Sequence, residues 1–293
     1  MARRLFCEIH PLAYALSVEK QKLVRRLRNL APSARLAREQ VEDDLPVVVY
    51  RHKSLIRRRL ANVELELQEN KAVSLGLAAP KVDRILIRPG ETFSFWTLVG
   101  PVSSRRGYKE GLTISNDRAT RGVGGGLCQF TNLIHWMVLH TPLEITEHHH
   151  HGGLDLFPDF NRQIPFGTGT SIVFNYLDYR FHNPTDQTFQ LRTYVTEEHL
   201  CGELRAERPL GQKFHVHEKD AYFHRDGGKV YRHNRIYRTA RDKATGNEVL
   251  HEELLENNAL VCYDEALITA PILEERPVGE RPVGERPAPM LAG

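Results

Sequence analysis

The hydrophobic pattern of the chain is most regular in its middle, directly after a run of glycines. Leu127, Phe130, Ile134 and Met137 recur at the spacing of one helical face, and Pro142 forbids continuation of a helix. This spacing predicts a helix over about 127–140. The preceding glycines favour a tight turn, because glycine adopts backbone angles closed to other residues.

Cys128 falls in the first turn of this predicted helix. Unpaired amide groups and the positive end of the helix dipole favour a thiolate there, so we expect a thiol more acidic than that of a free cysteine. The N–H groups of Gly126, Leu127 and Cys128 lack helical partners at such a position and can form an oxyanion hole. We assign the adjacent Gly124 and Gly125 to the same substrate-binding turn.

A strand pattern follows the helix and leads into four consecutive histidines. Residues 143–147 alternate between apolar and polar, and the histidines occupy positions 148–151. A helix of this length spans roughly 20 Å and the extended segment roughly 26 Å, so a short turn between them returns the histidines to the level of Cys128. Alternation places His149 and His151 on the face that packs on the helix, and turns the other two histidines away.

A cysteine at a helix N-terminus with an imidazole from the neighbouring strand is the arrangement of covalent catalysis. The amide of Gln129 can donate to the oxyanion or bind substrate, although capping or surface exposure explains it equally well. Two alternatives stay open. Cys128 can be a small buried hydrophobe beside a polar histidine loop. Cys128 can also form a set of zinc ligands with His149 and His151, although CxxC and HExxH spacings are absent.

The remaining pattern is rich in short strands. It predicts strands at 46–50, 61–67 and 85–87, a short helix or turn at 73–79, and a β-rich second half with a hairpin turn at 226–228. We therefore expect an α+β fold, with a mixed or antiparallel sheet and a Gly-rich turn leading into a central cysteine-bearing helix.

The two ends of the chain differ from this middle part. Residues 17–42 combine spaced leucines with basic residues, which predicts amphipathic helices that either pack on the protein or lie on an anionic membrane. The tail repeats a unit rich in proline and charge, so we expect it to be disordered. The predicted organisation is a helical N-terminal segment (1–45), one domain (46–267) and a disordered tail (268–293).

Composition narrows the functional classes. The chain is 41% hydrophobic and 26% charged, and its formal net charge of +3 gives no case for nucleic-acid binding. Four widely spaced cysteines favour a reducing compartment, and GVGGG lacks the lysine of a P-loop. With neither a signal peptide nor a membrane-spanning stretch evident, we expect a protein of the cytoplasm or of the inner face of the membrane.

Three segments resemble the VanW-like family, which is named for an accessory protein found with vancomycin-resistance genes. They are ILIRPGETFSFWTLVG (85–100), GYKEGLTISNDRATRGVGGGLCQFTNLIHWMVLHTPLEI (107–145) and NYLDYRFHNPTD (175–186). Family members resemble one another most in a GGG-x-CQ motif and in a histidine at the end of the next strand. In this chain these features match Gly124, Gly125, Gly126, Cys128, Gln129 and His151.

The resemblance implies an activity, because some VanW-domain proteins have been linked to L,D-transpeptidation through the motif cysteine. One departure concerns an Asp-Ala-Thr segment of many members, which this chain replaces with Gly169, Thr170 and Ser171. If that aspartate orients the histidine, the role passes here to a residue such as Asp178 or is absent.

We therefore expect a cysteine-dependent acyl transferase acting on peptidoglycan peptides or precursors. Cys128 would be the nucleophile, with His151 as general base and His149 beside it, and no cofactor is needed. A non-catalytic accessory protein that binds peptidoglycan or a glycopeptide is the alternative from another class, and a zinc-dependent hydrolase is the third.

Overall fold

The structure is a computed structural model that describes residues 10–30, 35–57, 65–115, 118–150, 153–156, 158–159 and 163–277. The chain forms two compact units. Unit 1 consists of Met1–His150 and Gly169–Gly211, and unit 2 consists of His151–Thr168 and Gln212–Gly293. The range expected to form one domain, 46–267, includes parts of both units, and most of the expected disordered tail lies outside the described residues.

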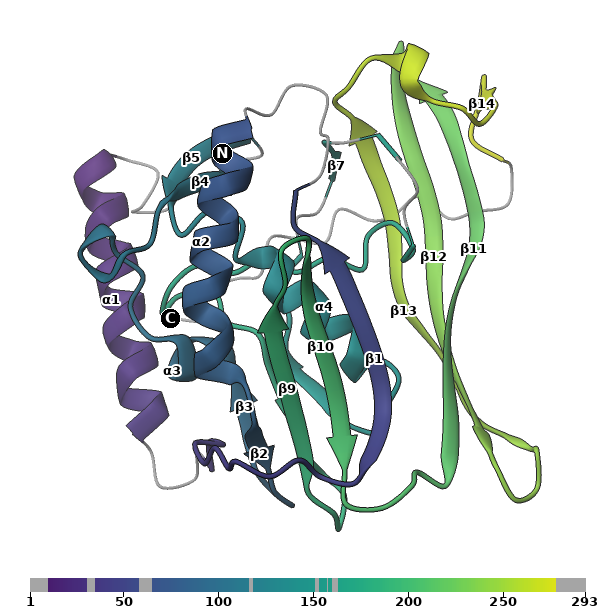
Figure 1. Cartoon of the computed structure of the whole chain (residues 1–293). Helices are drawn as coiled ribbons and strands as arrows, with labels where there is room; N and C mark the ends of the chain where they lie inside the picture. Colours follow the sequence, from purple (N-terminus) through teal and green to yellow (C-terminus); the bar gives the residue numbers. More distant parts are fainter. Residues whose placement is uncertain are drawn as a thin grey trace. The chain divides into compact units, whose positions relative to one another are not determined.

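Unit 1 holds all the long helices of the described chain (Figure 1). Its helices are α1 (Pro11–Leu30), α2 (Leu65–Val82), α3 (Phe95–Val99) and α4 (Cys128–Val138), with a 3-10 turn η2 (Ser104–Arg106). Its strands are β1 (Val47–Leu55), β2 (Ile85–Ile87), β3 (Thr92–Ser94), β4 (Glu110–Ser115), β5 (Arg118–Val123), β6 (Glu144–Glu147), β8 (Arg180–His182), β9 (Phe189–Val195) and β10 (His199–Ala206).

The strands of unit 1 form three antiparallel groups. The largest has the order β1-β10-β9-β2, a second has the order β3-β8-β6, and β4 and β5 form a hairpin. Gly202 of β10 lies opposite Thr193 of β9, so both point to the same face of the first sheet. A Cβ at Gly202 would meet Leu133 and Met137 of α4, while the Thr193 hydroxyl donates to Ala79 of α2. Helices α2 and α4 therefore cover one face of this sheet.

The hydrophobic core of unit 1 lies under these two helices. Phe93 stacks on Phe181 at 4.7 Å between ring centroids, and Phe95 meets Phe130 of α4 edge to face at 5.4 Å. All four rings are fully buried. Such aromatic pairs bury a large apolar area in preferred geometries, so the first pair stabilises the second sheet and the second pair packs α4 against α3.

Helix α2 replaces the strand expected at 61–67 and extends the short helix or turn expected at 73–79. The prediction was wrong because the alternation ANVELEL was judged over too short a window. Over the whole segment the buried positions Leu67, Leu75, Ala78 and Val82 have helical spacing. Residues 61–64 lie outside the described part of the chain.

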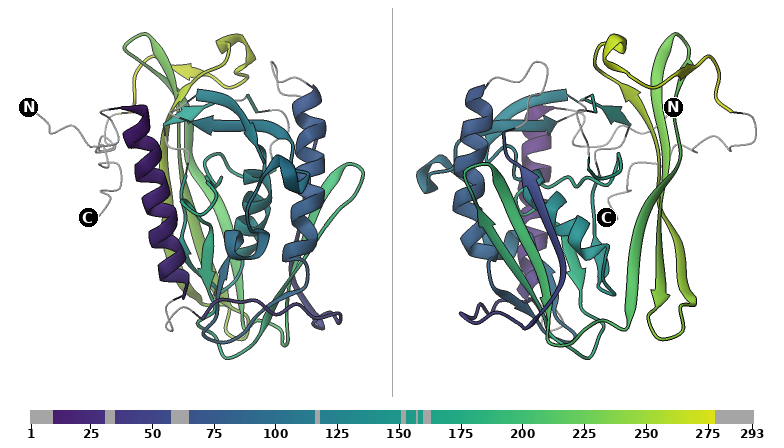
Figure 2. Two further views of the ribbon diagram at one scale, coloured as in Figure 1. Left: turned by 90° about the vertical axis from the view of Figure 1, so that its left-hand side faces the viewer. Right: turned by 45° about the vertical axis from the view of Figure 1, so that its right-hand side comes forward.

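Helix α1 begins and ends earlier than the segment expected at 17–42, and it runs along one side of unit 1 (Figure 2). The later residues are extended rather than helical. Leu36 forms a parallel β-bridge with Thr92, and Gln40 forms an antiparallel bridge with Ile85. Leu36 and Gln40 therefore pair with the edge strands β3 and β2, a role that periodicity alone does not distinguish from a helix.

Unit 2 is built on three long, twisted antiparallel strands (Figure 2). Its elements are β7 (Leu154–Asp155), β11 (Gln212–Asp226), β12 (Lys229–Asp242), β13 (Glu248–Val261), the 3-10 turn η3 (Glu265–Leu267) and β14 (Ile272–Leu273). Gly227 and Gly228 both have positive φ in the predicted hairpin turn. Strands β7 and β14 pair in parallel with β13 and β11. The expected α+β class with mixed pairing is confirmed.

Candidate active site

The chain enters helix α4 through a turn at Gly124–Leu127, at the end of the β4–β5 hairpin (Figure 1). Gly124 and Gly126 have φ values of 78° and 88°, which favour glycine. Gly125 is needed for a different reason. A Cβ there would lie 2.3 Å from the carbonyl oxygen of Gly111 in β4, so the two backbones touch.

Two amide groups at this turn have no backbone hydrogen-bond acceptor among the described residues. The Leu127 N–H donates to the Gly124 carbonyl at 3.4 Å, and the Gln129 N–H donates to the Gly126 carbonyl at 3.0 Å. The N–H groups of Gly126 and Cys128 are left over from this pattern. The Leu127 N–H therefore already has an acceptor. The N–H groups that remain for an oxyanion are those of Gly126 and Cys128.

Cys128 is the first residue of α4 and is partly exposed as a residue, while its thiol is buried. Burial raises the pKa of this thiol, while the backbone amides of Ile172 and of Cys128 itself act weakly in the opposite direction. The expectation of a thiol more acidic than a free cysteine is therefore wrong. Desolvation disfavours the thiolate more strongly than the helix terminus favours it.

The side chain of Gln129 is used within the fold. Its amide nitrogen donates to the Ser54 hydroxyl and to the Leu55 carbonyl, both at 2.8 Å. These bonds tie the first turn of α4 to the end of β1. Both amide protons of Gln129 have protein acceptors in this arrangement.

The histidines follow β6, and a bulge in that strand changes which of them faces α4. Ile145 pairs with Phe181 and Glu147 pairs with Arg180, so Thr146 is an extra residue that shifts the alternation by one. The ring of His148 consequently stacks on His135 of α4 at 4.4 Å. The expectation that His148 points away from the helix is wrong for this reason.

His148 is mostly buried. Burial lowers the pKa of its imidazole more than the hydrogen bond to the Gly169 carbonyl raises it, and the nearby His149 lowers it further. Its Nε2–H donates to the Gly169 carbonyl at 3.0 Å. The Nδ1–H of His150 donates to the same carbonyl at 3.3 Å.

His149 forms a carboxylate–imidazole pair with Glu147. Its Nε2–H donates to Glu147 Oε1 at 3.0 Å, which assigns the proton to Nε2 and leaves Nδ1 as an acceptor. Arg25 of α1 donates two hydrogen bonds of 2.5 and 2.6 Å to the same carboxylate. Burial opposes ionisation, but the hydrogen bonds from His149 and Arg25 outweigh it and lower the pKa of Glu147 to about 2.

The segment Gly169–Ile172 joins the cysteine helix to the histidines. On one side, the backbone N–H and the hydroxyl of Thr170 donate to Asn132 Oδ1 of α4 at 2.6 and 2.8 Å. On the other side, the Ser171 N–H donates to the His149 carbonyl at 2.7 Å. In the described part of the chain, neither His148 nor His149 contacts the Cys128 sulfur. His151 lies outside the described residues.

Asp178 has a structural role. It is almost fully buried and accepts hydrogen bonds from Ser94 (2.6 Å), from the Trp96 N–H (3.0 Å) and from Arg180 (2.8 Å). Sequence reasoning missed Glu147, which pairs with a histidine instead. Its position two residues before His149 was a usable signal, because residues two apart in an extended segment share a face.

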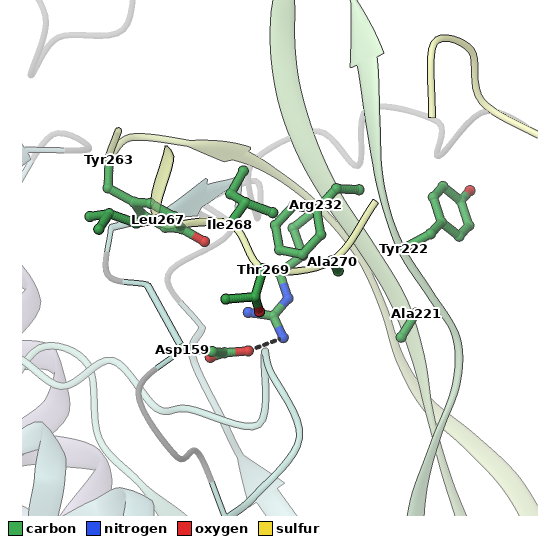
Figure 3. A pocket seen from close by; sticks show the side chains of 10 residues that line it. Asp159, Ala221, Tyr222, Arg232, Tyr263, Leu267, Ile268, Thr269 and Ala270 are labelled. Carbon is green, nitrogen blue, oxygen red and sulfur yellow. Dashed lines mark ion pairs between the residues drawn. The ribbon is translucent and has the colours of Figure 1, made fainter. Parts of the chain in front are cut away.

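A separate cavity of about 190 Å³ lies within unit 2 (Figure 3). Arg232 of β12 reaches it and pairs with Asp159 at 2.5 Å. The guanidinium also lies over the rings of Phe166 and Phe223, at 4.5 and 5.4 Å from their centroids. The contacts of Arg232 stabilise this unit, and sequence reasoning had singled out none of these residues.

Among the described residues, no group of three or more histidine, cysteine, aspartate or glutamate side chains is arranged to hold a metal ion. The described helices include none that is both long enough and apolar enough to cross a bilayer.

Comparisons with known proteins agree on one family. The model of a family described as VanW like protein matches residues 70–205. The chain is 31% identical over 222 residues to the vancomycin B-type resistance protein VanW of Enterococcus faecalis (strain ATCC 700802 / V583), covering 76% of this chain and 80% of that protein.

A second relative is the uncharacterized protein YoaR of Bacillus subtilis (strain 168), which is 28% identical over 127 residues, or 42% of this chain and 39% of that protein. No solved structure matches. Because the first similarity extends over most of both proteins, the chain belongs to the VanW-like family.

Proposed function

We propose that this protein is a cysteine-dependent acyl transferase with Cys128 as its nucleophile. The observation that carries the proposal is the pair of N–H groups without a backbone acceptor in the described chain, those of Gly126 and Cys128, at the residue that bears the sulfur. Preorganised backbone donors next to a nucleophile are what acyl transfer requires to stabilise its oxyanion.

The proposed reaction passes through a thioester. The Cys128 sulfur bonds to a peptide carbonyl carbon, and its proton passes to a histidine base. The carbonyl oxygen becomes an oxyanion held by the amides of Gly126 and Cys128. Collapse breaks the C–N bond, and the departing amine takes the proton. A second amine, or water, then attacks the thioester and releases the thiol.

A general base is essential to this proposal because the raised pKa keeps Cys128 a thiol at rest. We propose His151 for this role, with His149 beside it. The ionised Glu147 supports His149, since it fixes the proton on Nε2 and leaves Nδ1 free to accept another. Glu147 thus supplies the orienting carboxylate for which the sequence offered only Asp178.

The proposed substrates are peptidoglycan peptides or their precursors. The similarity to a vancomycin resistance protein supports this choice and a role in vancomycin resistance. A free side-chain amine of a second such peptide would attack the thioester, and the product would be a new cross-link or an altered precursor.

Intact-protein mass spectrometry tests the proposal. With a peptidoglycan stem tetrapeptide and no amine acceptor, we expect the protein to gain the mass of the peptide less its leaving amino acid. Cys128→Ala should abolish the adduct, while the matched control Cys201→Ser, at a partly exposed cysteine of β10, should retain it. An adduct that persists in Cys128→Ala would refute Cys128 as nucleophile.

A non-catalytic binding function is the alternative, and the raised thiol pKa together with the internal bonds of Gln129 favours it. Under this alternative the tetrapeptide binds the wild type and Cys128→Ala equally well in calorimetry, and neither protein gains mass. The two experiments therefore separate catalysis from binding.

A further inference from the structure

Helix α1 attaches to unit 1 through polar contacts on one face. Arg25 forms the bidentate pair with Glu147 and also donates to the Tyr176 carbonyl at 3.2 Å. Asn29 accepts a hydrogen bond of 2.7 Å from Arg180. These contacts define which side of the helix faces the protein.

The opposite face of α1 carries a stripe of exposed leucines. Successive residues of an α-helix advance by about 100°, so the leucines fall within an arc of about 60°, and Arg25 lies about 190° from its centre. They are Leu12 (69% exposed), Leu16 (65%), Leu23 (57%), Leu27 (61%) and Leu30 (75%). We call this stripe the leucine face.

The spacing of the leucine face does not suit a second copy of the same helix. Leu16, Leu23 and Leu30 are seven residues apart, as in one position of a heptad. The other core position of that heptad would hold either Glu19 and Arg26, three residues on, or Lys20 and Leu27, four residues on, so each register includes a charged residue. A two-stranded coiled coil would therefore bury charge along its seam.

Charge indicates what the leucine face binds. Lys20 and Arg26 are exposed and flank the stripe on its two sides. The helix also contains Lys22, Arg25 and Arg28, against a single acidic residue, Glu19. A narrow apolar stripe bordered by cations matches the interface of an anionic bilayer, where leucines enter the acyl boundary and cations meet lipid phosphates.

We propose that the leucine face of α1 binds the surface of an anionic lipid bilayer, with the helix lying in the plane of the headgroups. The proposal concerns α1 and does not rest on the chemistry of Cys128. Loss of acyl transfer and loss of membrane binding are therefore separate results.

Co-sedimentation of the full chain with vesicles tests the proposal. We expect binding to phosphatidylglycerol vesicles and at least about tenfold weaker binding to phosphatidylcholine vesicles. The double variant Leu23→Glu/Leu27→Glu should lower the partition coefficient on phosphatidylglycerol by about tenfold or more. Both leucines are exposed, so circular dichroism should show an unchanged fold.

Val249→Glu is the matched control, because Val249 is 51% exposed on β13 of the other unit. It should bind phosphatidylglycerol vesicles like the wild type. The proposal is overturned if the leucine double variant binds as well as this control, or if the wild type does not bind anionic vesicles.

Two further measurements test the contribution of charge to membrane binding and the possibility that the leucine face binds a second copy of the chain. Lys20→Glu/Arg26→Glu should weaken binding by about tenfold or more, and added salt should weaken the wild type in the same direction. Light scattering should give the same mass for the wild type and the leucine double variant. A dimer that only the wild type forms would instead assign the leucine face to a second copy and overturn the proposal.

Discussion

At the scale of single residues, Cys128 shows two opposing effects on one atom. The helix start and two nearby amides favour the thiolate, whereas enclosure by protein removes the water that would stabilise its charge. Desolvation is the larger effect. Cys128 is therefore a thiol at neutral pH and becomes nucleophilic only when a base removes its proton.

This balance predicts the pH dependence of chemical labelling. A raised pKa means that the thiolate fraction grows only above the ordinary range of cysteine, so alkylation of Cys128 by iodoacetamide should keep accelerating beyond pH 9. At pH 7 it should be about tenfold or more slower than that of the exposed Cys262. Peptide mass spectrometry measures both rates. A plateau at Cys128 below pH 8 would contradict the desolvated thiol.

Glu147 predicts a measurable loss of stability. Its pKa falls from 4.5 to about 2 in the folded protein, a difference of about 3 kcal/mol at pH 7. Glu147→Gln should therefore lower the free energy of unfolding by about 2 to 3 kcal/mol, measured by urea denaturation. Glu144→Gln, at an exposed residue of the same strand, should change it by less than about 0.5 kcal/mol.

The effect of Glu147→Gln depends on pH in a defined direction. A depressed carboxyl pKa stabilises the fold above the unfolded value and loses that effect as pH falls through the folded value. The difference in free energy of unfolding between wild type and variant should have its full size above pH 5 and shrink as pH falls from 4.5 towards 2. A gap that stays constant down to pH 3 would show that the charge of Glu147 is not its source.

At the scale of elements, the turn before α4 depends on two backbones in contact. A Cβ on Gly125 would lie 2.2 Å from the carbonyl carbon of Gly111, and a Cβ on Gly111 would lie 2.4 Å from the Gly125 oxygen. Neither obstacle is a side chain that can rotate away. The glycines therefore hold the cysteine helix against β4.

We expect Gly125→Ala to lower the free energy of unfolding by about 3 kcal/mol or more, because overpacking against backbone cannot relax cheaply. Gly76→Ala in α2 is the matched control, since a Cβ there meets nothing within 4 Å. It should stabilise the protein by about 0.5 to 1 kcal/mol, as alanine favours a helix interior. Thermal unfolding of both variants tests the contrast; equal effects would contradict it.

At the scale of the whole molecule, the two units are stabilised by different interiors. Unit 1 has an extensive hydrophobic core under α2 and α4. Unit 2 buries a charged group, Arg232, between two aromatic rings and near Asp155 and Asp159. A buried charge is costly unless its partners remain, so unit 2 should be sensitive to changes in this cluster.

Arg232→Met tests this difference. The variant removes the cation and leaves Asp155, which is 2% exposed, without the Arg232 charge. We expect a loss of about 3 kcal/mol in urea denaturation. Arg225→Met, which breaks a partly exposed pair with Glu265, should cost less than about 1 kcal/mol. Similar losses in the two variants would show that the buried cluster contributes no more than a surface pair.

Short-range features of this protein follow from its sequence alone. The spacing of Phe130, Ile134 and Met137 places α4 within two residues of its observed ends, and the glycines at 227–228 mark the hairpin of β11 and β12. The family motifs identify the chain without coordinates. Each of these depends on neighbouring residues, whose geometry local sterics and hydrophobic period determine.

Tertiary structure decided the properties that depend on distant residues. The bulge at Thr146 turned His148 rather than His149 to α4, and burial of the thiol raised the pKa of Cys128 although the Ile172 amide acts in the opposite direction. Glu147 acquired its partner Arg25 from a helix 122 residues away in sequence. Register, desolvation and long-range ion pairs are set when the whole chain packs, and no local pattern encodes them.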